Sequence, residues 1–187
     1  MTTLFIKNMV CDRCILVVRE QLEKLGIGIE QIKLGEVKTR EQVSGETKQK
    51  VDLALTKLGF ELIDDKKSRI IEKIKTLIID LVHRRENDSK QNLSDLLSKE
   101  LHHDYNYLSG LFSEVEGITI EKYFIAQKIE KVKELLVYDE LSLSEIAYRL
   151  NYSSVAYLSN QFKKVTGLTP SYFRQVKEDK RKPLDKV

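Results

Sequence analysis

The 187-residue sequence has little cysteine, proline and glycine, and it contains no tryptophan. Two cysteines cannot supply the several disulfides that hold small secreted domains together, so a reducing cytoplasm is expected. Two prolines and eight glycines leave few breaks and favour helix. No apolar run approaches the roughly 20 residues of a membrane span, and Met1 to Met9 lacks the apolar core of a secretory leader. These absences together predict a cytoplasmic, globular protein that does not span a membrane.

Positive charge is concentrated near the carboxyl end of a chain whose formal net charge is +3. Residues 142–187 contain nine lysines and arginines against four acidic residues, whereas residues 64–141 contain 13 against 16. Because phosphate neutralisation dominates nucleic-acid affinity, contact with DNA is expected in the last segment. Its final residues fit either a DNA-binding arm or a solvated terminus. The basic residues there are Lys177, Lys180, Arg181, Lys182 and Lys186.

The start of this basic segment predicts two short helices, a tight turn between them and a third helix. Ser142 and Glu145 form the S-x-x-E pattern of a capping box, which starts the first helix. Asn151 marks the turn, because asparagine tolerates a left-handed backbone. Ser153 or Ser154 can cap the second helix. The predicted inner side of that helix contains Tyr157, Leu158, Gln161 and Phe162.

The outer side of the second helix is small and polar, and its last turn is basic. Such a helix fits the major groove of DNA, although an ordinary helical hairpin with exposed small residues is the alternative. The residues expected at or near base edges are Ser154, Val155, Ala156, Ser159 and Asn160. Lys163, Lys164 and Arg174 are expected to contact phosphate or to brace the fold.

The run Ile146–Arg174, IAYRLNYSSVAYLSNQFKKVTGLTPSYFR, resembles the second helix-turn-helix of AraC/XylS-type transcription regulators. The ending F-K-K-x-x-G-x-T-P-x-x-x-R is the specific part, and the similarity covers about the last hundred residues. Asn151 stands where that family more often has glycine, and it meets the same backbone need. The resemblance implies a transcription regulator that binds double-stranded DNA and works with the transcription machinery.

Residues 50 positions apart recur in this half of the chain and predict a second helix-turn-helix unit. The matching pairs are Leu93/Leu143, Tyr107/Tyr157, Leu108/Leu158, Phe112/Phe162, Gly117/Gly167 and Thr119/Thr169. A connecting helix is predicted over 120–138. Two units joined by one stiff helix can enter successive major-groove turns, about 34 Å apart. In the family, one domain reads a long asymmetric site in this way.

The first unit is acidic where the second is basic, because Ser113 and Glu114 stand in place of the two lysines. Carboxylates repel phosphates, so the second unit is expected to dominate affinity. Asn106 can pair with an adenine edge, and Tyr105 can reach phosphate or stack. Tyr107 is expected in the core. The groove-facing candidates of the first unit are Tyr105, Asn106, Ser109 and Gly110.

The first 66 residues predict a strand, a helix, one or two strands, a second helix and a last strand. The two helices are expected over about 14–25 and 46–58. This order is typical of a small α/β sandwich of the split β-α-β kind. The segment 28–47 is short for a complete two-stranded hairpin, which argues against a four-stranded sheet.

Met9, Cys11 and Cys14 form the pattern M-x-C-x-x-C between the first strand and its helix. This pattern resembles the heavy-metal-associated domain of copper chaperones and metal-transporting ATPases. The helix dipole and Arg13 are expected to lower the cysteine pKa, and two thiolates can hold one soft ion such as Cu(I). A redox pair and a retained fold without a ligand are the alternatives. Met9 is expected to pack in the core.

A predicted linker helix carries an apolar stripe over residues 70–82, and residues 86–91 form a polar break. The stripe fits packing within the chain or against a second copy in a homodimer. The expected domains are a ferredoxin-like domain at 1–66, the linker helix and break at 67–88, and an AraC-type DNA-binding domain at 89–187.

The sequence thus predicts an α+β protein, with a ferredoxin-like α/β sandwich ahead of an all-α double helix-turn-helix domain. Its expected function is sequence-specific transcription regulation, controlled by a soft metal ion or a thiol signal at Cys11 and Cys14. The alternative is a metal-handling protein whose helical domain is a protein-interaction module. An enzyme is not expected, since the sequence has no glycine-rich phosphate loop and no carboxylate/histidine set at ligand spacing.

Overall fold

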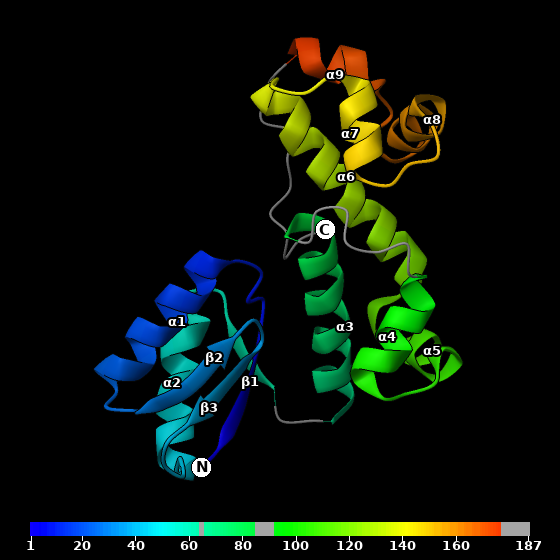
Figure 1. The fold of residues 1–187 in the computed structure, drawn as a ribbon. Coiled ribbons are helices and arrows are strands. Elements are labelled where there is room, and N and C mark those ends of the chain that lie inside the picture. Colours follow the sequence, from blue (N-terminus) through cyan, green and yellow to red (C-terminus); the bar gives the residue numbers. More distant parts are fainter. Residues whose placement is uncertain (64–65, 85–91, 177–187) are drawn as a thin grey trace. The chain divides into compact units, whose positions relative to one another are not determined.

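The computed structural model describes residues 1–63, 66–84 and 92–176 (Figure 1). The chain divides into two units, 1–76 and 77–187, and each is described by itself. The division falls inside helix α3 (Lys66–His83), so one helix contributes to both units. The polar break predicted at 86–91 and the basic residues from 177 onward lie outside the described residues.

Unit 1 contains a four-stranded antiparallel sheet in the order β2-β3-β1-β4, with two helices on one of its faces (Figure 1). Helix α1 connects β1 to β2, and α2 connects β3 to β4, which gives the order β-α-β-β-α-β. The bounds are β1 (Thr3–Lys7), α1 (Asp12–Lys24), β2 (Ile29–Lys33), β3 (Glu36–Thr39), α2 (Gly45–Thr56) and β4 (Glu61–Ile63).

The expectation against a four-stranded sheet was wrong. The segment between the two helices is long enough for both β2 and β3, because the turn that joins these strands is very short. Strands β2 and β3 are joined by only two residues, Leu34 and Gly35. Gly35 has a φ of 74°, a left-handed value that such tight turns require and that glycine adopts without steric cost. The complete hairpin therefore occupies residues 29–39, and residues 40–44 connect it to α2.

The core of unit 1 lies between the sheet and its two helices. Leu4 and Ile6 alternate along β1 and point into this core, where they pack with Val18 and Leu22 of α1 and with α2. Met9, which was predicted to pack in the core, is buried there. Phe5 lies between Leu4 and Ile6 and therefore points to the other face of the sheet.

The first half of α3 contacts that other face. The Arg69 guanidinium lies 4.7 Å from the centre of the Phe5 ring, and the Lys73 Nζ lies 5.5 Å from it. Most of the predicted stripe of α3 is buried within the single chain, so a homodimer through residues 70–82 would require these side chains to be uncovered. The buried residues of α3 are Ile70, Ile71, Ile74, Ile78, Ile79 and Val82.

Unit 2 consists of the end of α3 and six further helices within its described part. The long helix α6 has the predicted bounds, Ile120–Tyr138, with α4 and α5 before it and α7, α8 and α9 after it (Figure 1). No helix in the described part of the chain is both long and apolar enough to cross a membrane. The other helices are α4 (Leu93–Leu101), α5 (Tyr105–Glu116), α7 (Leu143–Arg149), α8 (Val155–Thr166) and α9 (Pro170–Val176).

The predicted 50-residue repeat is confirmed by matching aromatic contacts in unit 2. Phe112 of α5 packs on Tyr123 of α6 with ring centres 5.6 Å apart. Phe162 of α8 packs on Phe173 of α9 at 5.5 Å, and all four rings are buried. The two copies are therefore α4–α5 with the start of α6, and α7–α8–α9, each built around one aromatic pair.

Candidate nucleic-acid interface

The second helix-turn-helix begins and bends where the sequence predicts. The Ser142 Oγ accepts a hydrogen bond from the Glu145 backbone N–H at 3.2 Å, and the Ser142 N–H donates to the Glu145 carboxylate at 2.7 Å. This is the predicted capping box. Asn151 has the expected left-handed φ, 52°. Of the two serines that could cap α8, Ser154 is the one that does so, because its Oγ accepts a hydrogen bond from the Tyr157 N–H at 3.0 Å.

Helix α8 presents one exposed face that combines small, amide and basic side chains. The exposed positions follow one another at spacings of one, three and four residues, which places them on the same side of the helix. Leu158 and Phe162 lie on the opposite side and are buried. The residues of this face, which we call the α8 face, are Ala156, Tyr157, Asn160, Lys163 and Lys164.

The predicted contact residues of α8 differ in how far they reach solvent. Ala156 and Asn160 are exposed, whereas Val155 and Ser159 are half-buried at the edges of the α8 face. Ser154 is exposed, but its hydroxyl caps the helix. Of the residues predicted at or near base edges, only Ala156 and Asn160 are therefore at the centre of the α8 face.

Tyr157 was predicted on the inner side of α8, and that prediction was wrong, since its side chain is 54% exposed. Leu158, one residue later, fills the buried position, and a step of one residue turns a helix by about 100°. Gln161, assigned to the same side, is half-buried and accepts a hydrogen bond from the Tyr152 hydroxyl at 2.8 Å. Tyr157 thus joins the α8 face.

The basic end of α8 is available for an anionic partner. Lys163 and Lys164 are both exposed, and neither has a carboxylate partner among the described residues. Arg174 differs from them. Its Nη2 donates to the Leu141 carbonyl at 2.7 Å, and its Nε lies 3.1 Å from the Asp139 carboxylate. Of the two roles predicted for Arg174, the structure gives it the brace, which ties α9 to the end of α6.

Helix α5, the counterpart of α8 in the first copy, has an equivalent exposed face with different chemistry. Its exposed residues begin with Asn106 and Tyr107 and continue to Gly110 and Glu114, while Ser109 is half-buried. Tyr107 was predicted in the core, and that prediction was wrong, since the side chain is 48% exposed. As in the second copy, the buried position belongs to the leucine one residue later.

The hydroxyl of Tyr105, a residue predicted to reach phosphate or to stack, donates to the carboxylate of Glu121 at the start of α6. Burial of the phenol and this hydrogen bond raise the pKa of Tyr105. The same bond lowers the pKa of Glu121. The contact joins α5 to α6, and the second copy has Val155 and Ser171 at the equivalent positions.

A polar cluster holds α8 against α6, and sequence patterns did not reveal it. The Lys128 Nζ of α6 lies 3.8 Å from the centre of the Tyr152 ring, in the turn before α8. The Tyr152 hydroxyl donates to Gln161 of α8. Burial lowers the pKa of Lys128 to about 8, while the cation–π contact favours its charged form. Burial also raises the pKa of Tyr152.

The second candidate site is the cysteine pair of unit 1. Cys11 occupies the N-cap position of α1 without a side-chain capping hydrogen bond, and its Sγ lies 3.3 Å from the Sγ of Cys14; both thiols are free and half-buried. The predicted lowering of the pKa is wrong for Cys14, because burial and the contact with Cys11 raise it. Within the described residues, no group of three or more histidine, cysteine or acidic side chains is placed to hold a metal ion.

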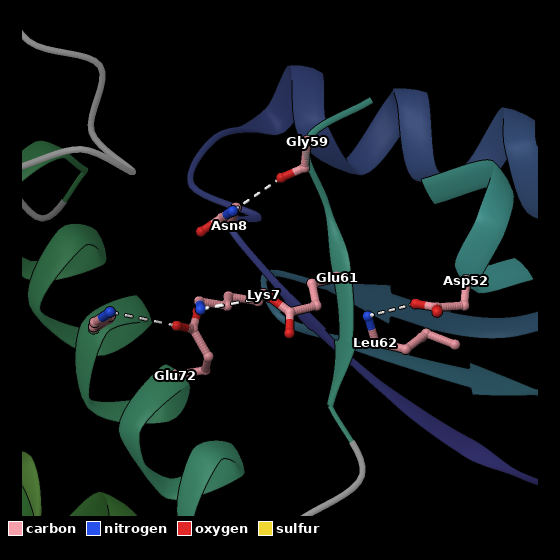
Figure 2. Close-up of polar contacts among 8 residues, drawn as sticks. Lys7, Asn8, Asp52, Gly59, Glu61, Leu62 and Glu72 are labelled. Atoms are coloured by element: carbon pink, nitrogen blue, oxygen red, sulfur yellow. Dashed lines mark hydrogen bonds and ion pairs between the residues drawn. The ribbon is translucent and has the colours of Figure 1, made fainter. Parts of the chain in front are cut away.

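The loop that carries this pair is fastened to the neighbouring strand connection. The Asn8 side-chain amide donates to the Gly59 carbonyl at 2.9 Å (Figure 2). Lys7 forms an ion pair with Glu61 at 3.5 Å, next to it on the sheet (Figure 2). The Asp52 carboxylate of α2 accepts from the backbone N–H of Leu62 at 3.3 Å (Figure 2). Two successive residues before the cysteine loop, Lys7 and Asn8, therefore contact β4 and the segment just before it.

Comparison with known proteins finds similarity in the helical part. Residues 97–176 match the family described as a helix-turn-helix domain, a range that begins in α4 and ends with α9. Over 100 residues, the chain is 32% identical to the uncharacterized HTH-type transcriptional regulator YtdP of Bacillus subtilis (strain 168), which covers 54% of this chain and 13% of that protein. The matched range contains both α5 and α8.

Two further similarities extend this result. The xylose operon regulatory protein of Escherichia coli (strain K12) is 26% identical over an alignment 192 positions long, which covers 91% of this chain and 48% of that protein. The C-terminal domain of AraT, a response regulator from Geobacillus stearothermophilus, superposes with a TM-score of 0.50 at 28% identity, over 60% of this chain and 88% of that chain. The chain spans less than half the length of the two curated relatives.

Proposed function

We propose that this protein is a sequence-specific DNA-binding transcription regulator of the AraC/XylS type, with α8 as its main DNA-reading helix. The observation that carries the proposal is the α8 face, on which Asn160 lies one turn from Lys163 and Lys164. An amide pairs with base edges, and exposed ammonium groups neutralise phosphates. The helix-turn-helix match and the similarity to transcription regulators support the same role.

The proposed partners are double-stranded DNA and the transcription machinery, in the cytoplasm. Helix α5 enters the neighbouring turn of the major groove, and α6 sets the distance between the two recognition helices. Because α5 presents Glu114 where α8 presents Lys164, α5 contributes less to affinity. The proposed role is binding, and no reaction is assigned to the site.

The proposed input is the pair Cys11 and Cys14 in unit 1, whose β-α-β-β-α-β order agrees with a ferredoxin-like domain. Two sulfur donors fit a soft ion such as Cu(I), whereas zinc usually needs four ligands. The sulfur atoms are 3.3 Å apart, so both can act on one ion. Burial raises the pKa of Cys14, so the ion must displace a proton there. A thiol redox signal at the same pair is the alternative input.

Strand β1 offers a route from this pair to α3. Asn8, three residues before Cys11 and directly after β1, is bonded to the Gly59 carbonyl, and Phe5 of β1 contacts Arg69 and Lys73 of α3. A change in the cysteine loop would thus act on the strand that supports α3. Ligand control further requires that the two states bind DNA with different affinities.

The test of the DNA-binding role is an electrophoretic mobility shift with the full chain against genomic fragments, with and without Cu(I). We expect a sequence-selective shift in at least one condition. If no fragment is shifted selectively in either condition, the regulator proposal is wrong. Cu(I) binding in the absence of any DNA binding would favour the alternative, a metal-handling protein whose helical domain contacts other proteins.

The test of the input uses the Cys11→Ser/Cys14→Ser variant in the same assay. We expect the variant to bind the selected fragment but to lose any change that Cu(I) causes in the parent protein. A parent whose DNA affinity is the same with and without Cu(I) would contradict metal control, and so would a variant that still responds. Repeating the titration with an oxidant and a dithiol reductant in place of Cu(I) separates the redox alternative.

A further inference from the structure

Two tyrosines occupy the same position in the two recognition helices, and both are exposed. Tyr107 of α5 and Tyr157 of α8 are 50 residues apart, in register with the repeat. The leucines that follow them, Leu108 and Leu158, are fully buried. A tyrosine with only a packing role would be covered in the same way, whereas both of these rings remain accessible to a partner outside the chain.

The hydroxyls of these two tyrosines have no hydrogen-bond partner within the described part of the chain. The other tyrosines of the two copies that lie in contact with a neighbouring helix do have one. The Tyr105 hydroxyl donates to Glu121, that of Tyr123 accepts from Gln127, and that of Tyr152 donates to Gln161. Tyr107 and Tyr157 thus present an unused donor at the surface.

Other exposed tyrosines do not occupy equivalent positions in the two copies. Tyr138, Tyr148 and Tyr172 lie on α6, α7 and α9 rather than on α5 or α8. At none of the three does the position 50 residues earlier hold an aromatic residue. The duplicated, outward position therefore distinguishes Tyr107 and Tyr157 from surface tyrosines that occur singly.

Each of the two rings is also supported by an aromatic residue from the turn before its helix. The His103 ring lies 5.3 Å from the Tyr107 ring, and the Tyr152 ring lies 6.0 Å from the Tyr157 ring. A ring held in this way loses less rotational freedom when it meets a partner, which favours binding. The same support arises in both copies from different residue types, histidine in one and tyrosine in the other.

Tyr157 lies on the α8 face, three residues before Asn160 and seven before Lys164. We propose that Tyr107 and Tyr157 each donate a hydrogen bond from the hydroxyl to a DNA phosphate beside the groove, and so position the two recognition helices. This assignment rests on the proposed DNA-binding function. Because a phenol is a neutral donor, it adds affinity without releasing a counterion, and it reads no base.

The experiment compares Tyr157→Phe, Tyr107→Phe and the double variant with the parent chain, all full length. Tyr148→Phe is the matched control, because it removes an exposed hydroxyl from α7. Fluorescence anisotropy measures binding to the fragment selected by mobility shift and to poly(dI–dC), over a series of salt concentrations. Thermal melting checks that each variant, which lacks only one hydroxyl oxygen per substituted tyrosine, is as stable as the parent.

For Tyr157→Phe we expect about tenfold weaker binding to both DNAs, with the slope of affinity against salt unchanged. Tyr107→Phe should show a smaller loss of the same kind, and Tyr148→Phe none. If the parent binds and Tyr157→Phe binds equally well, the tyrosine proposal is wrong while the regulator proposal survives. If only the selected fragment is bound less well, the hydroxyl reads a base and the phosphate assignment is wrong. A parent that binds neither DNA overturns both proposals.

Discussion

Helices α5 and α8, the equivalent helices of the two copies, share the same buried packing and differ on their exposed faces. Phe112 and Phe162 are buried at equivalent positions, and both helices end at a glycine with a left-handed φ. Their outward residues have diverged, and Glu114 stands where α8 has Lys164. The comparison teaches that the packing of the repeat has been kept while the chemistry of the exposed face has not.

The turns before the two helices also differ. Three residues, 102–104, separate α4 from α5, whereas five residues, 150–154, separate α7 from α8. The left-handed residue is His102 in the first turn and Asn151 in the second, so these positions are 49 rather than 50 apart. The turns before α5 and α8 therefore differ in length and in the place of the left-handed residue, although the buried residues of the two helices match at a spacing of 50.

The largest expected effect tests whether the two cores are equivalent. We expect Phe112→Ala and Phe162→Ala each to lower the free energy of unfolding by about 3–5 kcal/mol, because each removes a buried ring from an aromatic pair. Urea denaturation of the full chain, monitored by circular dichroism, measures the free energy of unfolding of each variant and of the parent. A cost below about 1 kcal/mol for either variant would show that its copy is not organised around the phenylalanine.

The next effect tests the difference in surface charge. We expect Lys163→Ala/Lys164→Ala to weaken binding to all DNA sequences and to reduce the slope of log affinity against log salt by about two units. Anisotropy titrations at several salt concentrations give the slope. An unchanged slope would mean that these lysines face away from DNA.

The reciprocal variant, Ser113→Lys/Glu114→Lys, makes the first copy basic. It should raise affinity and steepen the same slope, because α5 would then meet phosphate with positive charge. If α5 does not approach DNA, this variant will leave the slope as it is in the parent. The pair of variants thus shows whether the charge difference or the orientation of α5 limits its contribution.

A smaller effect concerns the brace that only the second copy has. Arg174 holds the Leu141 carbonyl and lies beside Asp139, whereas the equivalent position in the first copy is Phe124. We expect Arg174→Met to lower the free energy of unfolding by about 1.5–3 kcal/mol, the usual contribution of a hydrogen bond from a charged group. The slope of DNA affinity against salt should not change. A reduced slope with unaltered stability would restore the phosphate contact that the sequence allowed.

The parts of unit 2 that follow from local rules were predictable from sequence. The bounds of α6 and the capping box at Ser142 depend on residues within a few positions of one another. The repeat is likewise visible as identities 50 residues apart. The outward position of Tyr157 was missed because a tyrosine next to a buried leucine fits either side of a helix by composition alone.

Features that depend on distant contacts could not be predicted in this way. Lys128 and Tyr152 are 24 positions apart, and Arg174 meets a carbonyl 33 positions earlier. The raised pKa of Cys14 has the same origin, because it reflects burial by the folded chain rather than the start of a helix. The periodicity of apolar residues predicts the helices and strands, whereas the contacts between polar groups depend on how those helices and strands pack together.

The smallest expected effect tests a contact that only the first copy has, between Tyr105 and Glu121. Because this hydrogen bond lowers the pKa of Glu121, the unfolded chain binds more protons than the folded one between the two pKa values. The bond therefore stabilises the fold above the ordinary glutamate pKa of about 4.3, and this contribution is lost as the pH falls through the lowered value. Tyr105→Phe should be slightly less stable than the parent at pH 7, and the difference should shrink toward pH 3. Urea denaturation at several pH values measures it, and a difference that stays constant would show that Glu121 does not carry the effect.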